Sequence, residues 1–280
     1  MTIIMNQAIL VIGNGKSSVL QQTINILDDR NIDFIIYWDG KEELPKLESF
    51  YSKLFYVKNR QKIYWGTDTQ VQAEHDVMEY AINLGRDYAF FHLISAKDIP
   101  LMDKEYFKNF FSKPCKEYIG FVPDVNQNIK NRINYYYPVR NINIREGAGQ
   151  LLIKFFMKLN RFFRINRIDD RIQIEKGSNW FSIPQNLVKE ILRYPNMNIF
   201  KHSYLADELY VQTILSRLKP KFSDVEMDDN GMAARLIDWE RGNPYTFTKK
   251  DIGFLKSKVN KNYAFARKVE DAEIPKEIFK

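Results

Sequence analysis

The chain has 280 residues, enough for one large or two smaller domains, and its composition (45% apolar, 14% aromatic) is that of a globular protein. No window reaches the roughly 18 consecutive apolar residues of a membrane-spanning helix, and the N-terminus lacks a basic leader with a cleavage site. The formal charge of +7 favours an anionic partner: nucleic acid, a membrane surface or a phosphorylated ligand. We therefore expect a cytoplasmic protein, in which the single cysteine, Cys115, forms no intramolecular disulfide.

The first part of the chain alternates between predicted strands and helices. Continuous apolar runs at 8–12 and 32–38 are typical of strands covered on both faces, and a helix is predicted at 16–29 between them. The later elements predicted here are a helix from Asp68 to a stop at Gly85, a strand at 88–94, a short helix capped by Asp103 and a strand at 118–122. Such alternation indicates a mainly parallel sheet with helices on both faces.

The rest of the chain is predicted to be mainly helical. Helices are expected from Ser182 to near Pro195, through Val211 to Leu218, and after a capping box at Thr248–Asp251. Since no repeat or linker interrupts the sequence, we expect one α/β domain over 1–280.

Residues 150–165 form an amphipathic pattern, with leucine and phenylalanine on one side. The basic residues on another side are Lys154, Lys158, Arg161 and Arg164. Two interpretations stay open. Either the apolar side packs inward and the basic side meets water, or the helix binds anionic lipid headgroups.

Two patterns that suggest ligand sites have simpler explanations. The stretch Gly13–Ser17 lacks the glycine spacing of a P-loop or a dinucleotide fingerprint, so we expect a strand-to-helix turn. The histidines His75, His92 and His202 have no metal-ligand spacing, and no Asp-x-Asp follows a strand directly. We therefore predict no metal site.

Glu208 is unusual because it lies three residues before Val211 on the stripe that continues to Leu215 and Leu218. The helix dipole accounts for Asp207, in the same first turn. A carboxylate at the mouth of a core-facing stripe is partly removed from water, which makes it a better base. We therefore expect Glu208 to be partly buried at the end of this stripe and to act in chemistry.

Seven short strings occur in a familiar order. They are Ile36–Asp39, Trp65-Gly66, Ser95–Pro100, Gly177–Phe181, Asp207-Glu208 with Gln212–Leu215, Asp238-Trp239 with Gly242, and Phe265–Lys268. Together they resemble the core-2/I-branching β-N-acetylglucosaminyltransferases and the peptide O-xylosyltransferases, which form glycosyltransferase family 14. The resemblance spans about residues 8–270.

The resemblance implies a GT-A type, Rossmann-like fold, a UDP-sugar donor and inversion at the anomeric carbon without a bound metal or other cofactor. It assigns the catalytic base to Glu208 and the donor diphosphate to Arg267 and Lys268. Asn179 and Trp180 would lie beside the transferred sugar. Xylosyltransferases carry Asp where this chain has Asn179, so a GlcNAc-like and a xylose-like donor both stay open. It also suggests a nucleotide-binding half at about 1–125 and an acceptor half at about 126–280.

The chemistry of these residue types agrees with the resemblance. In inverting transfer a base takes the acceptor proton while the diphosphate leaves, and fixed cations can stabilise that leaving group. Arg241 is a weaker candidate for the same task. Asp39 and Asp98 each follow an apolar strand, where they would bind the nucleotide or cap a turn. Trp180 would stack on a sugar or pack in the core.

We therefore expect a metal-independent inverting glycosyltransferase in cell-surface polysaccharide biosynthesis. Its partners would be a UDP-sugar and a glycan acceptor, with a polyprenyl-diphosphate-linked glycan as one candidate. Residues 150–165 would allow peripheral contact with the inner face of the cell membrane. A non-catalytic sugar-nucleotide or glycan-binding protein of the same fold is the alternative. No nucleic-acid partner is expected, since no recognised motif is present.

Overall fold

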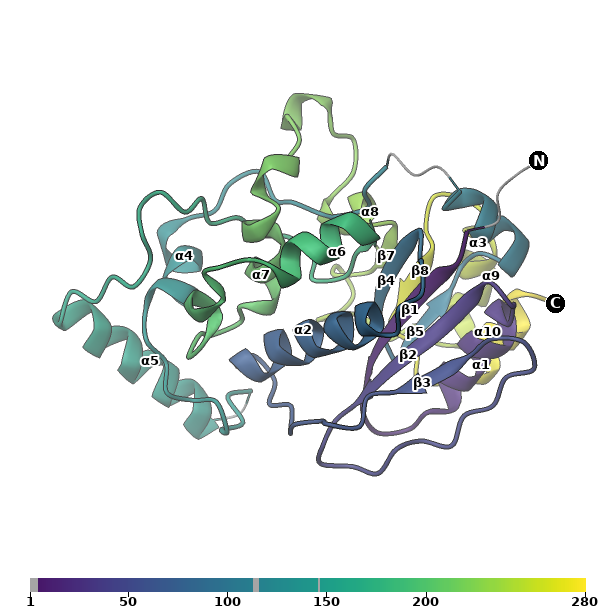
Figure 1. Ribbon diagram of the computed structural model, residues 1–280, viewed down its shortest axis with the longest axis horizontal. Coiled ribbons are helices and arrows are strands. Elements are labelled where there is room, and N and C mark those ends of the chain that lie inside the picture. Colours follow the sequence, from purple (N-terminus) through teal and green to yellow (C-terminus); the bar gives the residue numbers. More distant parts are fainter. Residues whose placement is uncertain (1–4, 113–115, 146) are drawn as a thin grey trace.

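The computed structural model describes residues 5–112, 116–145 and 147–280, so Cys115 lies outside the described residues (Figure 1). Its centre is a five-stranded sheet in the order β3-β2-β1-β4-β6. The strands are β1 (Gln7–Gly13), β2 (Ile32–Trp38), β3 (Leu54–Tyr56), β4 (Phe90–Ser95) and β6 (Ser182–Pro184). All neighbours are parallel except β6, which pairs antiparallel with β4. The mainly parallel sheet is confirmed.

Helices cover both faces of this sheet. Alternate side chains of a strand point to opposite faces, and in β1 Ile9 packs with helix α1 (Ser18–Leu27) whereas Leu10 packs with helix α2 (Asp68–Asn83). Helix α3 (Lys104–Phe110) joins α1 on its face, and α6 (Gln185–Leu192) joins α2 on the other. Burial on both faces explains why β1 and β2 are continuous apolar runs.

A second, three-stranded sheet brings the end of the chain back to its first part. Its strands are β5 (Asp98–Pro100), β8 (Phe265–Arg267) and β7 (Arg235–Ile237), and helices α9 (Ile252–Lys256) and α10 (Glu273–Ile278) pack nearby. Arg235, only 2% exposed, donates hydrogen bonds to the carbonyls of Leu93 and Phe181, and burial lowers its pKa to about 9. This guanidinium therefore connects the two sheets.

The remaining described chain is helical and irregular, and most of it lies to the left of the large sheet in Figure 1. Its helices are α4 (Gln127–Asn134), α5 (Gly147–Phe162), α7 (Asp207–Ile214) and α8 (Asp229–Met232). Short 3-10 segments occur at Met197–Phe200, Ser216–Leu218, Phe222–Asp224 and Lys249–Asp251. Among the described residues, no helix has the length and apolar character needed to cross a bilayer.

Several predicted helix ends are confirmed. Gly85 follows α2 with φ of +65°, a left-handed conformation that suits glycine. The Asp103 side chain accepts a hydrogen bond from the backbone N–H of Tyr106 at 2.9 Å. Thr248 and Asp251 form the reciprocal capping box, although the helix begins there with a 3-10 turn.

Two predictions are wrong. Residues 118–122 contribute one bridge, between Tyr118 and Ser182, instead of a strand. Backbone packing explains this, because a Cβ on Gly120 would lie 1.9 Å from the carbonyl oxygen of Asp229. Residues 182–184 form strand β6, and the helix begins only after Pro184, since the strand pairs with the edge of β4. For α5, whose orientation the sequence left open, the exposed leucine and phenylalanine side chains face outward.

Candidate active site

The order of the large sheet reverses direction between β1 and β4, and in such sheets ligands usually bind at the carboxyl ends of the strands at this point. The loop after β1 is the expected strand-to-helix turn. A Cβ on Gly13 would lie 2.2 Å from the indole ring of Trp38, and Gly15 has φ of +74°. The Gly15 N–H donates to Glu42, 2.6 Å away. These glycines thus serve local packing.

Strand β8 brings Arg267 to the end of β4. Its guanidinium donates to a carboxylate oxygen of Asp98 at 2.9 Å and to the hydroxyl of Ser95. The same guanidinium lies 4.3 Å from the centre of the Trp180 indole ring. Asp98 is 1% exposed and the Arg267 side chain is 21% exposed, so the ion pair is mostly removed from water. Three predicted site residues, Asp98, Trp180 and Arg267, therefore form one cluster.

Lys268, next to Arg267, lies among other positive charges. Burial and the charge of Lys97 lower its pKa, and Arg145 acts in the same direction. Glu270, the carboxylate that raises the pKa of Lys268, pairs more closely with Lys97 at 2.6 Å. An anion bound beside Lys268 would relieve this repulsion.

Asp39 and Arg241 have structural contacts. One oxygen of Asp39 accepts hydrogen bonds from the backbone N–H of Lys41 and of Ile63, at 3.0 and 3.1 Å, so its side chain caps the turn after β2. The guanidinium of Arg241 pairs with Asp238 and with Asp251. These contacts tie together the loop between β7 and α9, and they leave less of Arg241 free for a phosphate.

The Glu208 side chain is partly buried, as predicted, whereas that of its neighbour Asp207 faces the core. The Glu208 side chain is 34% exposed, and its carboxylate pairs with Arg132 at 2.8 Å and Lys176 at 3.4 Å. Asp207 is the buried carboxyl. Helix α7 is short and buried around most of its circumference, so a single apolar stripe does not define its inner side.

Asp207 belongs to a cluster of buried acids. Burial, followed by the negative charge of Glu208, raises the pKa of Asp207 to about 7. Glu74, on α2, is 2% exposed, and burial together with the charge of Asp207 raises its pKa well above the usual range. The side chain of Asn179 acts in the opposite direction and lowers the pKa of Glu74. A predicted sugar-facing amide thus lies beside a buried acid.

Residues 176–180 connect the two groups of charges. Lys176 contacts the Glu208 carboxylate, and the backbone N–H of Gly177 donates to the Glu208 carbonyl at 3.0 Å. Four residues after Lys176, the indole ring of Trp180 lies against the guanidinium of Arg267. The predicted base and the predicted diphosphate-binding arginine therefore adjoin the two ends of one short segment.

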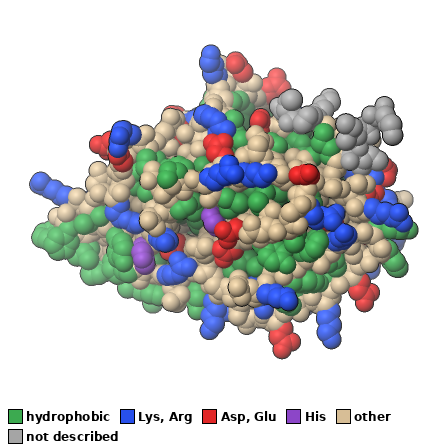
Figure 2. All heavy atoms as spheres, in the orientation of Figure 1, with side chains coloured by type: hydrophobic (Ala, Val, Ile, Leu, Met, Phe, Trp, Pro, Cys, Tyr) green, Lys and Arg blue, Asp and Glu red, His purple; other side chains and the backbone are tan. Residues whose placement is uncertain are grey.

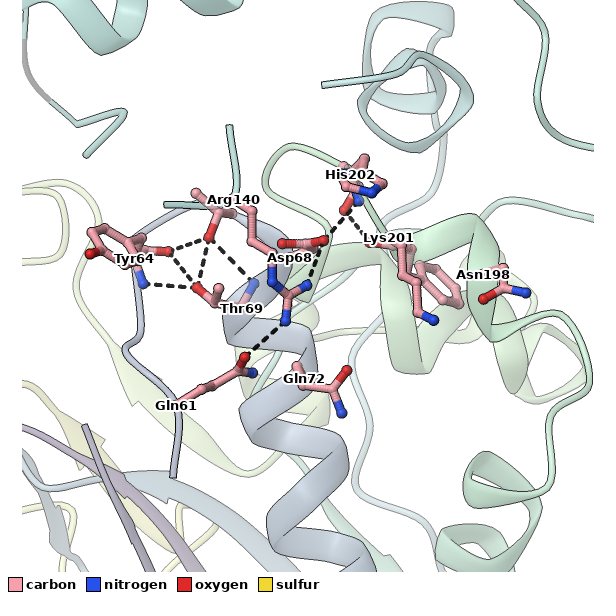
Figure 3. A network of polar contacts seen from close by, with 12 residues as sticks. Gln61, Tyr64, Asp68, Thr69, Gln72, Arg140, Asn198, Lys201 and His202 are labelled. Carbon is pink, nitrogen blue, oxygen red and sulfur yellow. Dashed lines mark hydrogen bonds and ion pairs between the residues drawn. The ribbon is translucent and has the colours of Figure 1, made fainter. Parts of the chain in front are cut away.

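A polar network holds the chain that leads into α7. Asp68, at the start of α2, accepts hydrogen bonds from Arg140 at 2.9 Å and from the backbone N–H of His202 at 2.8 Å (Figure 3). Arg140 also donates to Gln61. The backbone N–H of Leu205 donates to the carbonyl of Gly66 at 2.7 Å. Because both α2 and the segment after α4 take part, the entry to α7 is fixed from two sides.

Some charged residues of the site were not predicted from the sequence: Glu74, Arg132, Lys176, Lys97 and Arg145. A signal existed for Glu74, which lies three residues before Val77 on the stripe of α2, as Glu208 lies before Val211. Lys97 falls inside the string Ser95–Pro100. The cations Arg132 and Lys176 come from irregular or polar segments whose spatial neighbours have no local signature.

Within residues 5–112, 116–145 and 147–280, no three His, Cys, Asp or Glu side chains are grouped as metal ligands would be. His92 is a structural histidine, since its ring nitrogens lie 2.8 Å from Ser182 and 3.1 Å from Gln7, and burial keeps its pKa low.

Comparison of the sequence with known protein families identifies the family of this chain. The sequence matches the family described as Core-2/I-Branching enzyme over residues 8–259. The chain belongs to this family. A comparison with curated proteins finds no match. The family consists of glycosyltransferases of family 14, so this protein is a glycosyltransferase of that type, and the expected GT-A type α/β fold is confirmed. The matched range includes Asn179, Trp180 and Glu208 and ends before Arg267 and Lys268.

Proposed function

We propose that the protein transfers a GlcNAc-like or xylose-like sugar from a UDP-sugar to a glycan hydroxyl, with inversion at the anomeric carbon. The observation that carries this proposal is the segment 176–180. One of its ends contacts the carboxylate of Glu208 and the other contacts Arg267. A proton acceptor and a cation for the leaving group are thus held against one short stretch of chain, as single displacement requires.

In this reaction the acceptor oxygen forms a bond to the anomeric carbon while the bond from that carbon to the β-phosphate oxygen breaks. The acceptor proton goes to the carboxylate of Glu208, and UDP leaves with the bonding electron pair. Arg132 and Lys176 stabilise the ionised carboxylate, which is the form that can take up a proton. Trp180 would offer its ring to the sugar, and Asn179 its amide.

The diphosphate in this proposal is bound by Arg267 and Lys268 without a metal ion. Support comes from the lowered pKa of Lys268, caused by burial and by the neighbouring Lys97, since a diphosphate would supply the missing negative charge. Preorganised cations in a partly dry site stabilise a leaving anion at little reorganisation cost. UDP binding and turnover are therefore expected to persist in EDTA, and activity that chelation removes and manganese restores would contradict this.

A UDP-release assay with a panel of UDP-sugars and glycan acceptors tests the proposal, after a thermal-shift screen has selected the donor. A ligand that binds the folded state raises the apparent melting temperature, so the selective donor identifies itself. Acceptor-dependent UDP release supports transfer. Donor binding without release under any acceptor would favour the alternative, a non-catalytic sugar-nucleotide-binding protein of the same fold.

We further propose that the acceptor is a polyprenyl-diphosphate-linked glycan and that the enzyme works at the inner face of the cell membrane, in surface polysaccharide assembly. The exposed apolar and basic residues within 150–165 support this. A lipid-linked acceptor is then expected to be used better than the same glycan without its lipid.

A further inference from the structure

Helix α5 is held in one rotational orientation. The side chain of Asn160 donates to the carbonyl of Tyr136 at 2.9 Å and accepts from its N–H at 2.8 Å. Ile153 is buried in a small cluster with Tyr137 and Val139. A Cβ on Gly149 would lie 2.2 Å from the carbonyl oxygen of Asn143, so only glycine allows this close approach. These anchors fix which side of α5 faces outward.

The outward side is apolar. Its most exposed side chains are Leu151 at 67%, Phe155 at 56% and Phe162 at 80%, and Phe163 directly after the helix is 61% exposed. With 3.6 residues per turn, Leu151, Phe155 and Phe162 share one stripe along a helix about 24 Å long. Figure 1 places α5 at the end of the molecule away from the sheet, and in Figure 2 hydrophobic side chains gather at that end.

A basic stripe runs beside the apolar one. Lys154, Lys158 and Arg161 recur at helical spacing and are exposed, and Arg164 follows the helix. The sequence contains no acidic residue from Gly147 to Ile168. The helix therefore has three sides: one packed on the protein, one apolar and outward, and one cationic.

We propose that α5 and the residues up to 165 dock flat on an anionic lipid bilayer. The aromatic side chains would enter the boundary between headgroups and acyl chains, and the basic residues would meet the phosphates. Exposed apolar surface beside a one-sided positive stripe is typical of helices that bind membrane surfaces. Pairing of two copies through this side would bring the positive stripes close to each other, which disfavours a dimer.

The segment that leads into α5 reaches the candidate active site. Arg145 lies 5.3 Å from the centre of the Trp65 indole ring, and its charge contributes to the lowered pKa of Lys268. Docking of α5 would consequently hold the cationic part of the site near the bilayer surface. This consequence rests on the proposed function, whereas the docking itself does not.

Flotation with phosphatidylcholine vesicles, with and without phosphatidylglycerol, tests the docking in the absence of substrate. We expect the wild-type protein to float with the anionic vesicles. Since each basic residue near such a surface adds about fivefold to binding, Lys154→Gln, Lys158→Gln, Arg161→Gln and Arg164→Gln combined should weaken it several-hundredfold, on the order of 5 to the fourth power. A second variant, Leu151→Ser, Phe155→Ser and Phe162→Ser combined, should also fail to float.

The matched control removes four positive charges from the region of α9. It combines Lys249→Gln, Lys250→Gln, Lys256→Gln and Lys261→Gln, all at exposed positions, and is expected to float like the wild type. Because the altered side chains of α5 are exposed, all variants should retain the wild-type melting temperature and UDP release with a soluble acceptor. Failed flotation therefore bears on docking alone, and absent UDP release bears on the proposed function alone.

Three results would overturn the docking proposal. The first is wild-type protein that does not float with anionic vesicles. The second is equal flotation of the wild type and both α5 variants. The third is a dimer in light scattering that the serine variant abolishes, without any flotation, because the apolar side would then be an interface between two copies.

Discussion

The two ends of the candidate site gather charged groups of opposite sign. At the sheet end, Lys268 is crowded by Lys97, Arg267 and Arg145. At the α7 end, burial raises the pKa of both Asp207 and Glu74, and the charge of Glu208 adds to the first effect and that of Asp207 to the second. In the free protein, a proton can compensate the buried acids, whereas the lysine needs an anion. We therefore expect a division of roles, in which the α7 end of the site handles the proton and the sheet end binds the diphosphate.

The sharpest test of this division is Glu208→Gln, which keeps the size of the side chain but cannot accept the acceptor proton. Loss of a general base should lower kcat by roughly 10²–10⁴-fold. UDP affinity should barely change, because the diphosphate is assigned to the other end of the site. Arg132→Gln is the control, since it removes the 2.8 Å ion pair and leaves the carboxylate. Near-normal turnover of Glu208→Gln, or an equal loss in both variants, would remove Glu208 from the role of base.

The buried acids predict a pH-dependent stability difference. The pKa of Asp207 rises from about 4 in the unfolded chain to about 7 in the folded protein, so folding takes up a proton between these values. Its contribution therefore becomes more destabilising as pH rises through this window. Asp207→Asn should be more stable than the wild type at pH 8, by on the order of a few kcal/mol, with a much smaller gain at pH 4.

Urea unfolding of both proteins across this pH range measures the effect. Taking the difference between variant and wild type cancels titrating groups that do not interact with Asp207, such as His92, whose pKa is lowered by burial. Asp224→Asn, at an exposed position, is the control and should show no such difference. A constant difference between pH 4 and pH 8 would mean that Asp207 does not titrate in this window.

At the cationic end, Lys268→Ala should weaken UDP binding. A hydrogen bond to a charged phosphate contributes roughly 1.5–3 kcal/mol, which corresponds to about 10–150-fold in Kd. Isothermal titration with UDP measures it, with Lys250→Ala as an exposed control outside the site. Equal UDP affinity in wild type and Lys268→Ala would mean that the charge of Lys268 is compensated in another way.

The smallest effect is expected for Arg241→Gln. Its guanidinium already pairs with Asp238 and Asp251, so the variant should lose some stability while its Kd for UDP changes by less than about threefold. Melting temperature and UDP titration together separate the two interpretations of Arg241. A loss of UDP affinity as large as that of Lys268→Ala would return Arg241 to the diphosphate site.

Local patterns were sufficient for the elements that are long and covered on both faces. Strands β1 and β2 and helices α1 and α2 were predicted because burial leaves a continuous or periodic apolar signal. The three-residue strands β5, β7 and β8 carry no readable period, and pairing partners far apart in sequence create them. For α5 the period was correct, but no pattern states which side of a helix the rest of the chain covers.

The candidate site divides in the same way. Motif strings identified Asp98, Trp180 and Arg267, and the structure brings these three together. The orientation of α7 was not predictable, because it depends on the contact of Asp207 with Gln70 of α2, 3.3 Å away. The partners of Glu208 come from two other segments, so only the tertiary structure could identify them.

Backbone contacts fix the course of the chain at Gly177. A Cβ on Gly177 would lie 1.9 Å from the carbonyl oxygen of Gly120, and one on Gly120 would lie equally close to that of Asp229. Three stretches of main chain thus lie directly against one another. The two glycines are therefore barred from substitution by sterics alone, whereas position 179, two residues further on, already carries a side chain and is under no such backbone constraint.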